Sequence, residues 1–114
     1  MRLARACGLV VVAAGLMAGS GAARAASAEK GKAAFVQHGC WQCHGFQGQG
    51  GTAGKTLAPD PIAFEAFSAI VRSSNSGMPP YAEKILSDGD LADIYAYLQS
   101  VPKADYRSIP LLNQ

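Results

Sequence analysis

The sequence predicts an all-α fold in one small domain. Apolar residues recur at three- and four-residue spacings in several segments, which is the pattern of helices with one buried face. Serines suited to helix N-caps precede two of these segments, at Ser27 and Ser87. No segment alternates polar and apolar residues as a strand does, and no internal repeat is present. We therefore expect helices joined by long loops.

The first helix is expected over Ser27–His38. Ser27 would cap its N-terminus, and Glu29 lies in the first turn, where the helix dipole favours an acid. Gly39 would end the helix in a left-handed turn. One face of this helix carries Gly31, Ala34, Phe35 and His38.

The other helices are expected in the second half of the chain. One runs over Pro61–Ser73, with an apolar stripe of Ile62, Phe64, Phe67, Ile70 and Val71. One or two short helical turns are expected over Tyr81–Leu86. The last helix, over Asp88–Ser100, follows the N-cap Ser87 and is stopped by Pro102. Its apolar stripe is Leu91, Ile94, Tyr97, Leu98 and Val101.

The N-terminus has the organisation of a secretory signal peptide. Arg2 and Arg5 give a positive start, an apolar run follows from Ala6 to Ala18, and Ala23-Arg24-Ala25 forms a small-residue cleavage site. We expect residues 1–25 to be removed, with export to the periplasm and a mature domain over residues 26–114. The alternative is an uncleaved membrane anchor, but the apolar run is shorter than the roughly 20 residues that a spanning helix needs.

Cleavage would change the charge and leave a marginal domain. The 114-residue chain carries ten Lys and Arg against eight Asp and Glu, a formal net charge of +2. Loss of three arginines with the signal peptide leaves a net charge of −1 on 89 residues. With no basic patch, nucleic acid is not an expected partner. A domain of this size buries only about 60% of its unfolded surface, so a disulfide, metal or other covalent staple is expected.

The segment Gly45–Gly54 is a glycine-rich loop. The following Gly54-Lys55-Thr56 is similar to the end of a phosphate-binding P-loop, which needs a helix directly after it. Pro59 and Pro61 forbid the interior of such a helix. We interpret the loop as a turn that lets the chain pass close to another group.

Cys40-Trp41-Gln42-Cys43-His44 is the strongest functional motif. Cys-x-x-Cys-His is the haem attachment signature of c-type cytochromes, in which each thiol adds across one haem vinyl group and the histidine gives Nε2 to the iron.

Three other interpretations of the motif remain open. A thioredoxin-like redox pair expects a βαβ context, which is missing. A zinc site needs four ligands, and the only candidates are His38, Cys40, Cys43 and His44, within seven residues. A disulfide over so short a loop would stabilise little.

Met78 is the expected second axial ligand of the iron. It lies in a Gly/Pro loop, Ser76-Gly77-Met78-Pro79-Pro80-Tyr81, rather than on a helix stripe, so core packing explains it poorly. Met17 falls in the signal peptide, and His38 is two residues before Cys40, too close to reach the opposite face of the ring. His/Met ligation is a known haem class, and it raises the reduction potential.

These residues resemble the class I c-type cytochromes, in the small bacterial monohaem form. The resemblance covers nearly all of the mature chain and implies three to four helices around one covalently bound haem c. Gly31 and Phe35 look like the residues of the family's N-terminal helix, where the glycine permits a close helix crossing. Their counterparts on the C-terminal helix are Ile94, Tyr97 and Leu98. Pro59 resembles the family's loop proline, whose carbonyl orients the proximal histidine.

The resemblance implies an electron carrier rather than an enzyme. Cys40, Cys43, His44 and Met78 would bind the haem, with His44 and Met78 on the iron and no catalytic residue. The expected partners are redox proteins: a periplasmic dehydrogenase, for which the chain would be acceptor or subunit, and a terminal oxidase or another cytochrome. Membrane contact is expected only if the signal peptide is retained. Candidate pocket residues are Leu57, Phe64, Phe67, Ile70, Trp41 and Tyr81.

The C-terminal segment and two alternative functions are left open by the sequence. The segment Lys103–Leu112 carries Ile109 and Leu111, so it either folds back onto the domain or docks a partner. The alternative functions are a haem peroxidase or gas binder, which needs an open iron position, and a haem-free thiol oxidoreductase.

Overall fold

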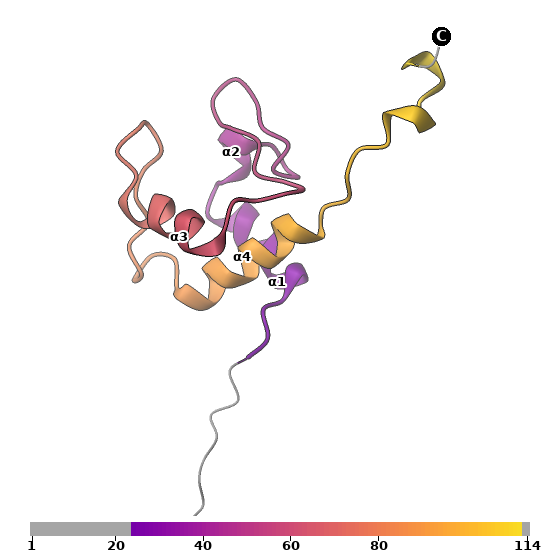
Figure 1. Ribbon diagram of the computed structural model, residues 1–114. Coiled ribbons are helices and arrows are strands. Elements are labelled where there is room, and N and C mark those ends of the chain that lie inside the picture. The colour runs from indigo at the N-terminus through magenta and orange to yellow at the C-terminus, as the bar shows by residue number, and fades with distance from the viewer. Residues whose placement is uncertain (1–23, 113–114) are drawn as a thin grey trace, which may run out of the picture.

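The computed structural model describes residues 24–112, and this part of the chain is helical without strands (Figure 1). The α-helices are α1 (Ala28–Gln37), α2 (Trp41–His44), α3 (Phe64–Ser73) and α4 (Asp88–Ser100). Two 3-10 turns follow, η1 (Tyr106–Ser108) and η2 (Pro110–Leu112). The all-α prediction is confirmed. The predicted signal peptide, up to residue 23, lies outside the described residues.

The predicted caps of α1 and α4 are confirmed. The Ser27 hydroxyl accepts a hydrogen bond from the Lys30 N–H, and the Ser87 hydroxyl accepts one from the Asp90 N–H at 3.1 Å. The predicted turn at Gly39 is also present, with φ of 74°. Between Tyr81 and Leu86 the chain makes a single turn, closed on the carbonyl of Ala82.

The prediction that the second helix starts at Pro61 is wrong, because α3 begins at Phe64. The Tyr95 hydroxyl donates to the carbonyl of Ile62 at 3.0 Å, so this carbonyl accepts from a side chain rather than from a helical amide. Ile62 and Ile70, both predicted in the buried stripe, are about half exposed (52% each). The stripe of α3 is therefore narrower than its sequence suggests.

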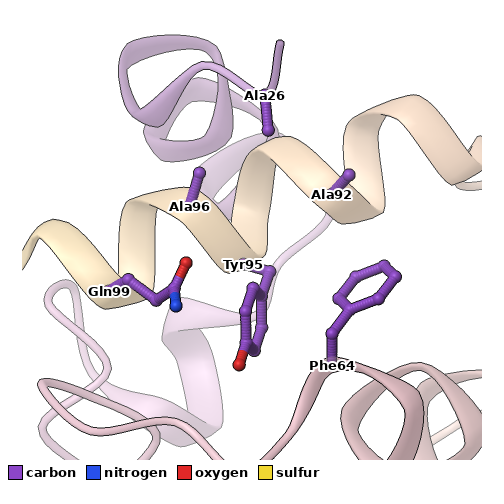
Figure 2. Close-up of a pocket in the computed structure, with 6 residues that line it drawn as sticks. All are labelled: Ala26, Phe64, Ala92, Tyr95, Ala96 and Gln99. Carbon is purple, nitrogen blue, oxygen red and sulfur yellow. The ribbon is translucent and has the colours of Figure 1, made fainter. Parts of the chain in front are cut away.

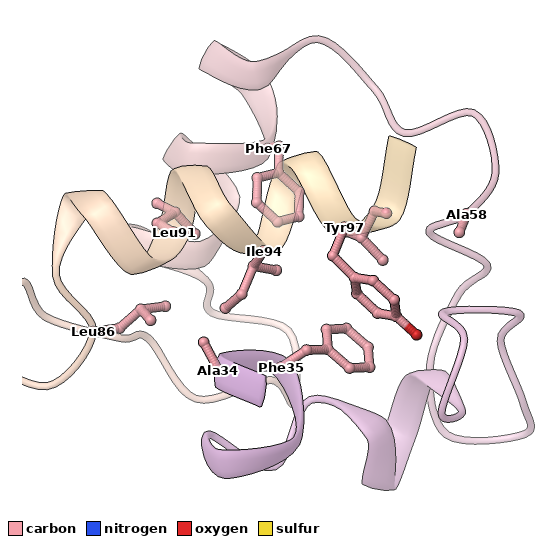
Figure 3. Packing of buried hydrophobic residues seen from close by; sticks show 9 residues of the cluster. Ala34, Phe35, Ala58, Phe67, Leu86, Leu91, Ile94 and Tyr97 are labelled. Carbon is pink, nitrogen blue, oxygen red and sulfur yellow. The ribbon is translucent and has the colours of Figure 1, made fainter. Parts of the chain in front are cut away.

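Helices α1 and α4 cross in close contact and form the centre of the fold (Figure 3). A Cβ added at Gly31 would overlap the backbone carbonyl of Asp93 and lie 2.8 Å from the Ile94 nitrogen. Phe35 and Leu98 beside this contact are 1% and 0% exposed. The predicted role of Gly31 as the residue that permits the crossing is confirmed.

The crossing also buries a charged group, because Asp93 on α4 is 1% exposed. Its Oδ1 accepts the backbone N–H of Ser27 at 2.7 Å, and its Oδ2 pairs with the Arg24 guanidinium. The Ser27 hydrogen bond, supported by Arg24, holds the pKa of Asp93 below its usual value. The carboxylate therefore fixes the entry of the chain into α1.

Helix α3 joins this pair through aromatic side chains. The Phe64 and Phe67 rings lie 5.1 and 5.4 Å from the Tyr95 ring on α4. Among the described residues, α3 forms no lengthwise helix–helix contact of the kind that α1 and α4 share. It is held to the domain by a few large side chains and by the loops at its ends.

The C-terminal segment extends away from the helices (Figure 1). Residues 102–111 are exposed, including Tyr106 and Leu111 at 58% and 78%. Lys103 makes an ion pair with Asp60 at 3.0 Å, but both side chains are about three-quarters exposed. The expectation that this segment folds back onto the domain is therefore wrong. No helix within residues 24–112 is long and apolar enough to cross a membrane.

Candidate functional site

The Cys40–His44 motif folds as one helical turn, which was not predicted. The His44 N–H donates to the Cys40 carbonyl at 3.0 Å, and Gly45 N–H donates to Trp41 at 2.9 Å. In this geometry residues at i, i+3 and i+4 share a face, so the N-cap residue Cys40 lies on the same side as Cys43 and His44 of α2. Both cysteines are free thiols, Cys40 half-buried and Cys43 exposed.

Burial raises the pKa of the Cys40 thiol, although its own backbone partly offsets this effect. A raised pKa reduces the thiolate population at neutral pH, and the thiolate is the nucleophile in disulfide exchange. This observation weighs against Cys40 as the attacking thiol of a thiol oxidoreductase.

His44 is fixed by a backbone carbonyl on the glycine-rich loop. Its Nδ1 lies 2.7 Å from the carbonyl oxygen of Lys55. A carbonyl can only accept, so Nδ1 carries the proton and Nε2 keeps its lone pair for a metal. The prediction that Pro59 supplies this carbonyl is wrong: the acceptor lies four residues earlier, because the loop turns back towards α2 sooner than the spacing suggested.

The glycine-rich loop approaches α2 closely, as its composition predicts. A Cβ added at Gly54 would lie 2.8 Å from His44 Nδ1 and from the Cys43 carbonyl oxygen. The Gly50 N–H donates to the His44 carbonyl at 2.8 Å. The loop runs to Phe64 without a helix, so the structure a P-loop needs is not formed there.

Met78 lies on the loop between α3 and α4 and is half-buried. Gly77 before it has φ of 86°, a conformation that favours glycine. Tyr81 ties this loop to the end of α1, because its hydroxyl donates to the His38 carbonyl at 2.8 Å. His38 stands two residues before Cys40, so the Met78 loop is anchored next to the α2 segment.

His38 itself packs against the loop rather than joining the motif. Its ring meets the Tyr81 ring edge-on at 6.3 Å. Within residues 24–112 no group of three or more His, Cys, Asp or Glu side chains is placed to hold a metal ion. The four candidate zinc ligands are all among these residues and do not gather into such a group.

The candidate pocket residues are divided between the core and its edge. Phe67 is buried, while the half-buried residues at the core's edge are Trp41, Leu57, Phe64 and Tyr81. Ile70 is about half exposed and does not belong to the core. The Trp41 ring stacks on Phe46 at 4.4 Å, and Phe46 is 57% exposed. Sequence reasoning missed Phe46, Lys55 and Arg72.

A shallow apolar depression of about 230 Å³ lies on the outer face of α4 (Figure 2). Its lining residues are Ala26, Phe64, Ala92, Tyr95, Ala96 and Gln99. It includes none of the α2 residues and not Met78. The candidate site is therefore the α2 face with the two loops beside it.

The residues present fit a covalently attached haem. Two free thiols and an imidazole with an available Nε2 share one helical face, which is the donor set that the c-type attachment chemistry uses. Met78, on a separate loop, has the thioether that a His/Met site would use.

Comparison with known families gives one match. The family model described as cytochrome C oxidase, cbb3-type, subunit III matches residues 26–98. The match contains α1 to the main part of α4, the motif and Met78. No curated protein and no solved structure matches the chain.

Proposed function

Because the chain belongs to the family of cbb3-type cytochrome c oxidase subunit III, we propose that it is a periplasmic carrier of single electrons with one covalent haem c, ligated by His44 and Met78. The membership confirms the predicted class I-like c-type cytochrome and its all-α cytochrome c fold, and with them electron transfer through haem. The observation that carries the finer proposal is the His44 Nδ1–Lys55 hydrogen bond, which leaves Nε2 available beside two free thiols.

Bound haem supplies a reversible one-electron couple between ferric and ferrous iron. Cys40 and Cys43 would hold the ring through thioethers, and the Lys55 carbonyl fixes the tautomer and orientation of His44. Met78 would occupy the second axial position. With both positions filled by the protein, transfer needs no substrate on the metal, which favours a carrier over a peroxidase or gas binder.

The proposed partners are redox proteins that meet the molecule beside α2. Cys43 is exposed there, and the nearby Gln42 and Gln47 give a neutral, polar surface. The family's description supports an oxidase as one partner. A periplasmic dehydrogenase is the proposed donor, for which this chain would be acceptor or subunit. Contacts of this kind are usually small, below about 1,200 Å² in total.

Export in cells with the c-type haem machinery tests the proposal. We expect an intact mass equal to the chain from Ala26 plus one haem, which acid solvent does not extract. Cys40→Ala and Cys43→Ala should each leave at most one thioether and lower the yield of bound haem. Haem that is fully extracted from the native sequence, or a second haem per chain, would contradict the proposal.

A second experiment addresses the partners. The purified haem-loaded protein is mixed with membranes that contain a cbb3-type oxidase, and separately with a reduced periplasmic dehydrogenase. We expect rapid oxidation in the first case and rapid reduction in the second, both slowed by Phe46→Glu at the α2 surface and little changed by salt, because the surface there is neutral. If this protein exchanges electrons with these partners no faster than an unrelated electron carrier does, the proposed partners are wrong.

A further inference from the structure

The loop that carries Met78 is held to the core at its far end, where Leu86 is 1% exposed, rather than around the methionine. It spans Ser74 to Ser87 between α3 and α4 without a regular helix. Met78 is half-buried, and the flanking residues Gly77, Pro79 and Pro80 are exposed. The chain itself therefore packs little apolar surface around the methionine. The polar contacts of the loop gather instead around Tyr81, three residues later.

Arg72, in the last turn of α3, bonds to both ends of the segment after Met78. Its Nη1 donates to the Tyr81 carbonyl at 2.9 Å and to the Leu86 carbonyl at 2.7 Å. Its Nη2 reaches the Asp88 carboxylate at 2.5 Å, but Asp88 is 74% exposed, so this ion pair contributes little. The arginine itself is only 21% exposed. Its two bonds to carbonyls are charge-assisted and partly shielded from water.

Tyr81 connects the same loop to two helices. Its backbone N–H donates to the Val71 carbonyl on α3 at 2.9 Å, and its hydroxyl donates to the His38 carbonyl at the end of α1. The polar groups of Tyr81 are thus all used: its N–H and carbonyl bond to α3, and its hydroxyl bonds to the end of α1. Arg72 and Tyr81 together form a clamp directly behind Met78.

We propose that Arg72 and Tyr81 are positioning residues that keep the Met78 thioether at the haem iron. The inference rests on the proposed His44/Met78 ligation. An iron–thioether bond is weak, so the fraction of molecules with Met78 detached depends on how strongly the loop is held in place. Loss of one hydrogen bond of the clamp shifts the equilibrium between attached and detached Met78 by the net free energy of that bond.

The test is imidazole binding to the ferric, haem-loaded protein. Imidazole binds only where Met78 has left the iron, so its apparent affinity rises in proportion to the detached population. Tyr81→Phe removes one neutral hydrogen bond and should raise the affinity about two- to twelvefold. Arg72→Gln removes bonds to a charged donor and should raise it about tenfold or more. Arg72→Lys, which retains a cation, should fall between the native protein and Arg72→Gln.

Two matched controls separate this role from general stability. Tyr95 and Tyr97 also donate their hydroxyls to backbone carbonyls, those of Ile62 and Phe46, at 3.0 and 2.8 Å. Tyr95→Phe and Tyr97→Phe should lower the melting temperature as much as Tyr81→Phe does and leave imidazole affinity unchanged. Equal imidazole affinities in all three variants would overturn the clamp.

Failure of the clamp and failure of the ligand assignment give different results. If Met78 is the ligand but is not held by the clamp, the ferric sulfur–iron band is present and Met78→Ala raises imidazole affinity strongly, while Tyr81→Phe has no effect. If Met78 is not the ligand, the native protein lacks the band and Met78→Ala changes nothing.

The buried carboxylate of Asp93 carries a second, independent inference. Its two oxygens are paired with the Ser27 N–H and the Arg24 guanidinium, and the side chain is 1% exposed. Cleavage after Ala25 would remove Arg24 and leave Oδ2 without its cation. The new α-ammonium would be that of Ala26, one residue before Ser27 and against α4 between Ala92 and Ala96 (Figure 2).

We infer that the α-ammonium of Ala26 replaces the Arg24 guanidinium on Asp93 in the mature protein. This step rests on the proposed cleavage site. The buried carboxylate then keeps a cation before and after processing, and the mature N-terminus is tied to α4. An unpaired buried carboxylate would otherwise be strongly destabilising.

Reactivity of the N-terminus tests this inference on the exported, haem-loaded protein. An ammonium held by Asp93 stays protonated, so cyanate should carbamylate Ala26 several-fold more slowly than in Asp93→Asn. Asp60→Asn, at an exposed position, should react at the native rate. Equal rates in native protein and Asp93→Asn, or a mature chain that retains Arg24, would overturn the inference.

Discussion

The crossing of α1 and α4 makes Gly31→Ala the most informative single change in the fold. The added Cβ would overlap the Asp93 carbonyl and lie 2.8 Å from the Ile94 nitrogen, whereas real Cβ contacts essentially never fall below 3.0 Å. The atoms it meets are backbone and cannot rotate away, so the helices must separate. As the helices separate, Phe35 and Leu98, which are 1% and 0% exposed, would lose packing contacts.

The expected cost follows from two opposing effects. Overpacking of a tight core costs about 1–3 kcal/mol, and a backbone clash falls at the upper end of that range. Alanine gains about 1 kcal/mol over glycine in a helix interior. The net loss is about 2 kcal/mol, which for a domain of this size lowers the melting temperature by about 8–16 °C.

Thermal unfolding of the haem-loaded protein, followed by circular dichroism, measures this loss. Gly89→Ala is the matched control, because it lies in the first turn of α4 and its nearest neighbour would be Ser87 Oγ at 3.8 Å. It should melt at the native temperature or slightly above. A Gly31→Ala protein that melts together with the Gly89→Ala protein would refute the reasoning.

Three further predictions concern the rest of the molecule. The pKa of Asp93 is lowered in the folded state from 3.8, so its contribution to stability is present above about pH 4 and is lost as the pH falls through the lower folded value. Acid unfolding should therefore be steeper in the native protein than in Asp93→Asn, and parallel curves would contradict this. Gly54→Ala places a Cβ 2.8 Å from His44 Nδ1 and should reduce haem incorporation several-fold, measured as haem per chain, whereas Gly51→Ala should not. Deletion after Val101 removes a segment that is exposed over residues 102–111 and should leave the haem spectrum intact while slowing reduction by the partner; loss of haem would exclude a docking role for this segment.

Much of the fold could be predicted from local sequence chemistry. The caps at Ser27 and Ser87 and the spacing of Leu91, Ile94 and Leu98 are local features, and α1 and α4 have the predicted positions to within one residue. The start of α3 could not be predicted, because Pro61 is compatible with a first turn. The carbonyl of Ile62 is instead taken by Tyr95, 33 residues away.

The site shows the same division between local and distant information. The motif Cys40–His44 and the exceptional place of Met78 in a Gly/Pro loop are evident from the sequence. The Lys55 carbonyl that fixes His44 is a backbone group, and any residue type could supply it. Arg72 was also missed, since a single arginine at the end of a helix carries no signal until its carbonyl partners at Tyr81 and Leu86 are known.

The optical spectrum of the exported protein, oxidised and reduced, tests the central claim most directly. The measurement is repeated after denaturation and acid-solvent extraction, and on Met78→Ala. We predict haem that stays with the chain and a weak ferric sulfur–iron band that is absent from Met78→Ala. Covalent haem without that band would contradict His44/Met78 ligation, and a chain without haem would contradict the electron carrier itself.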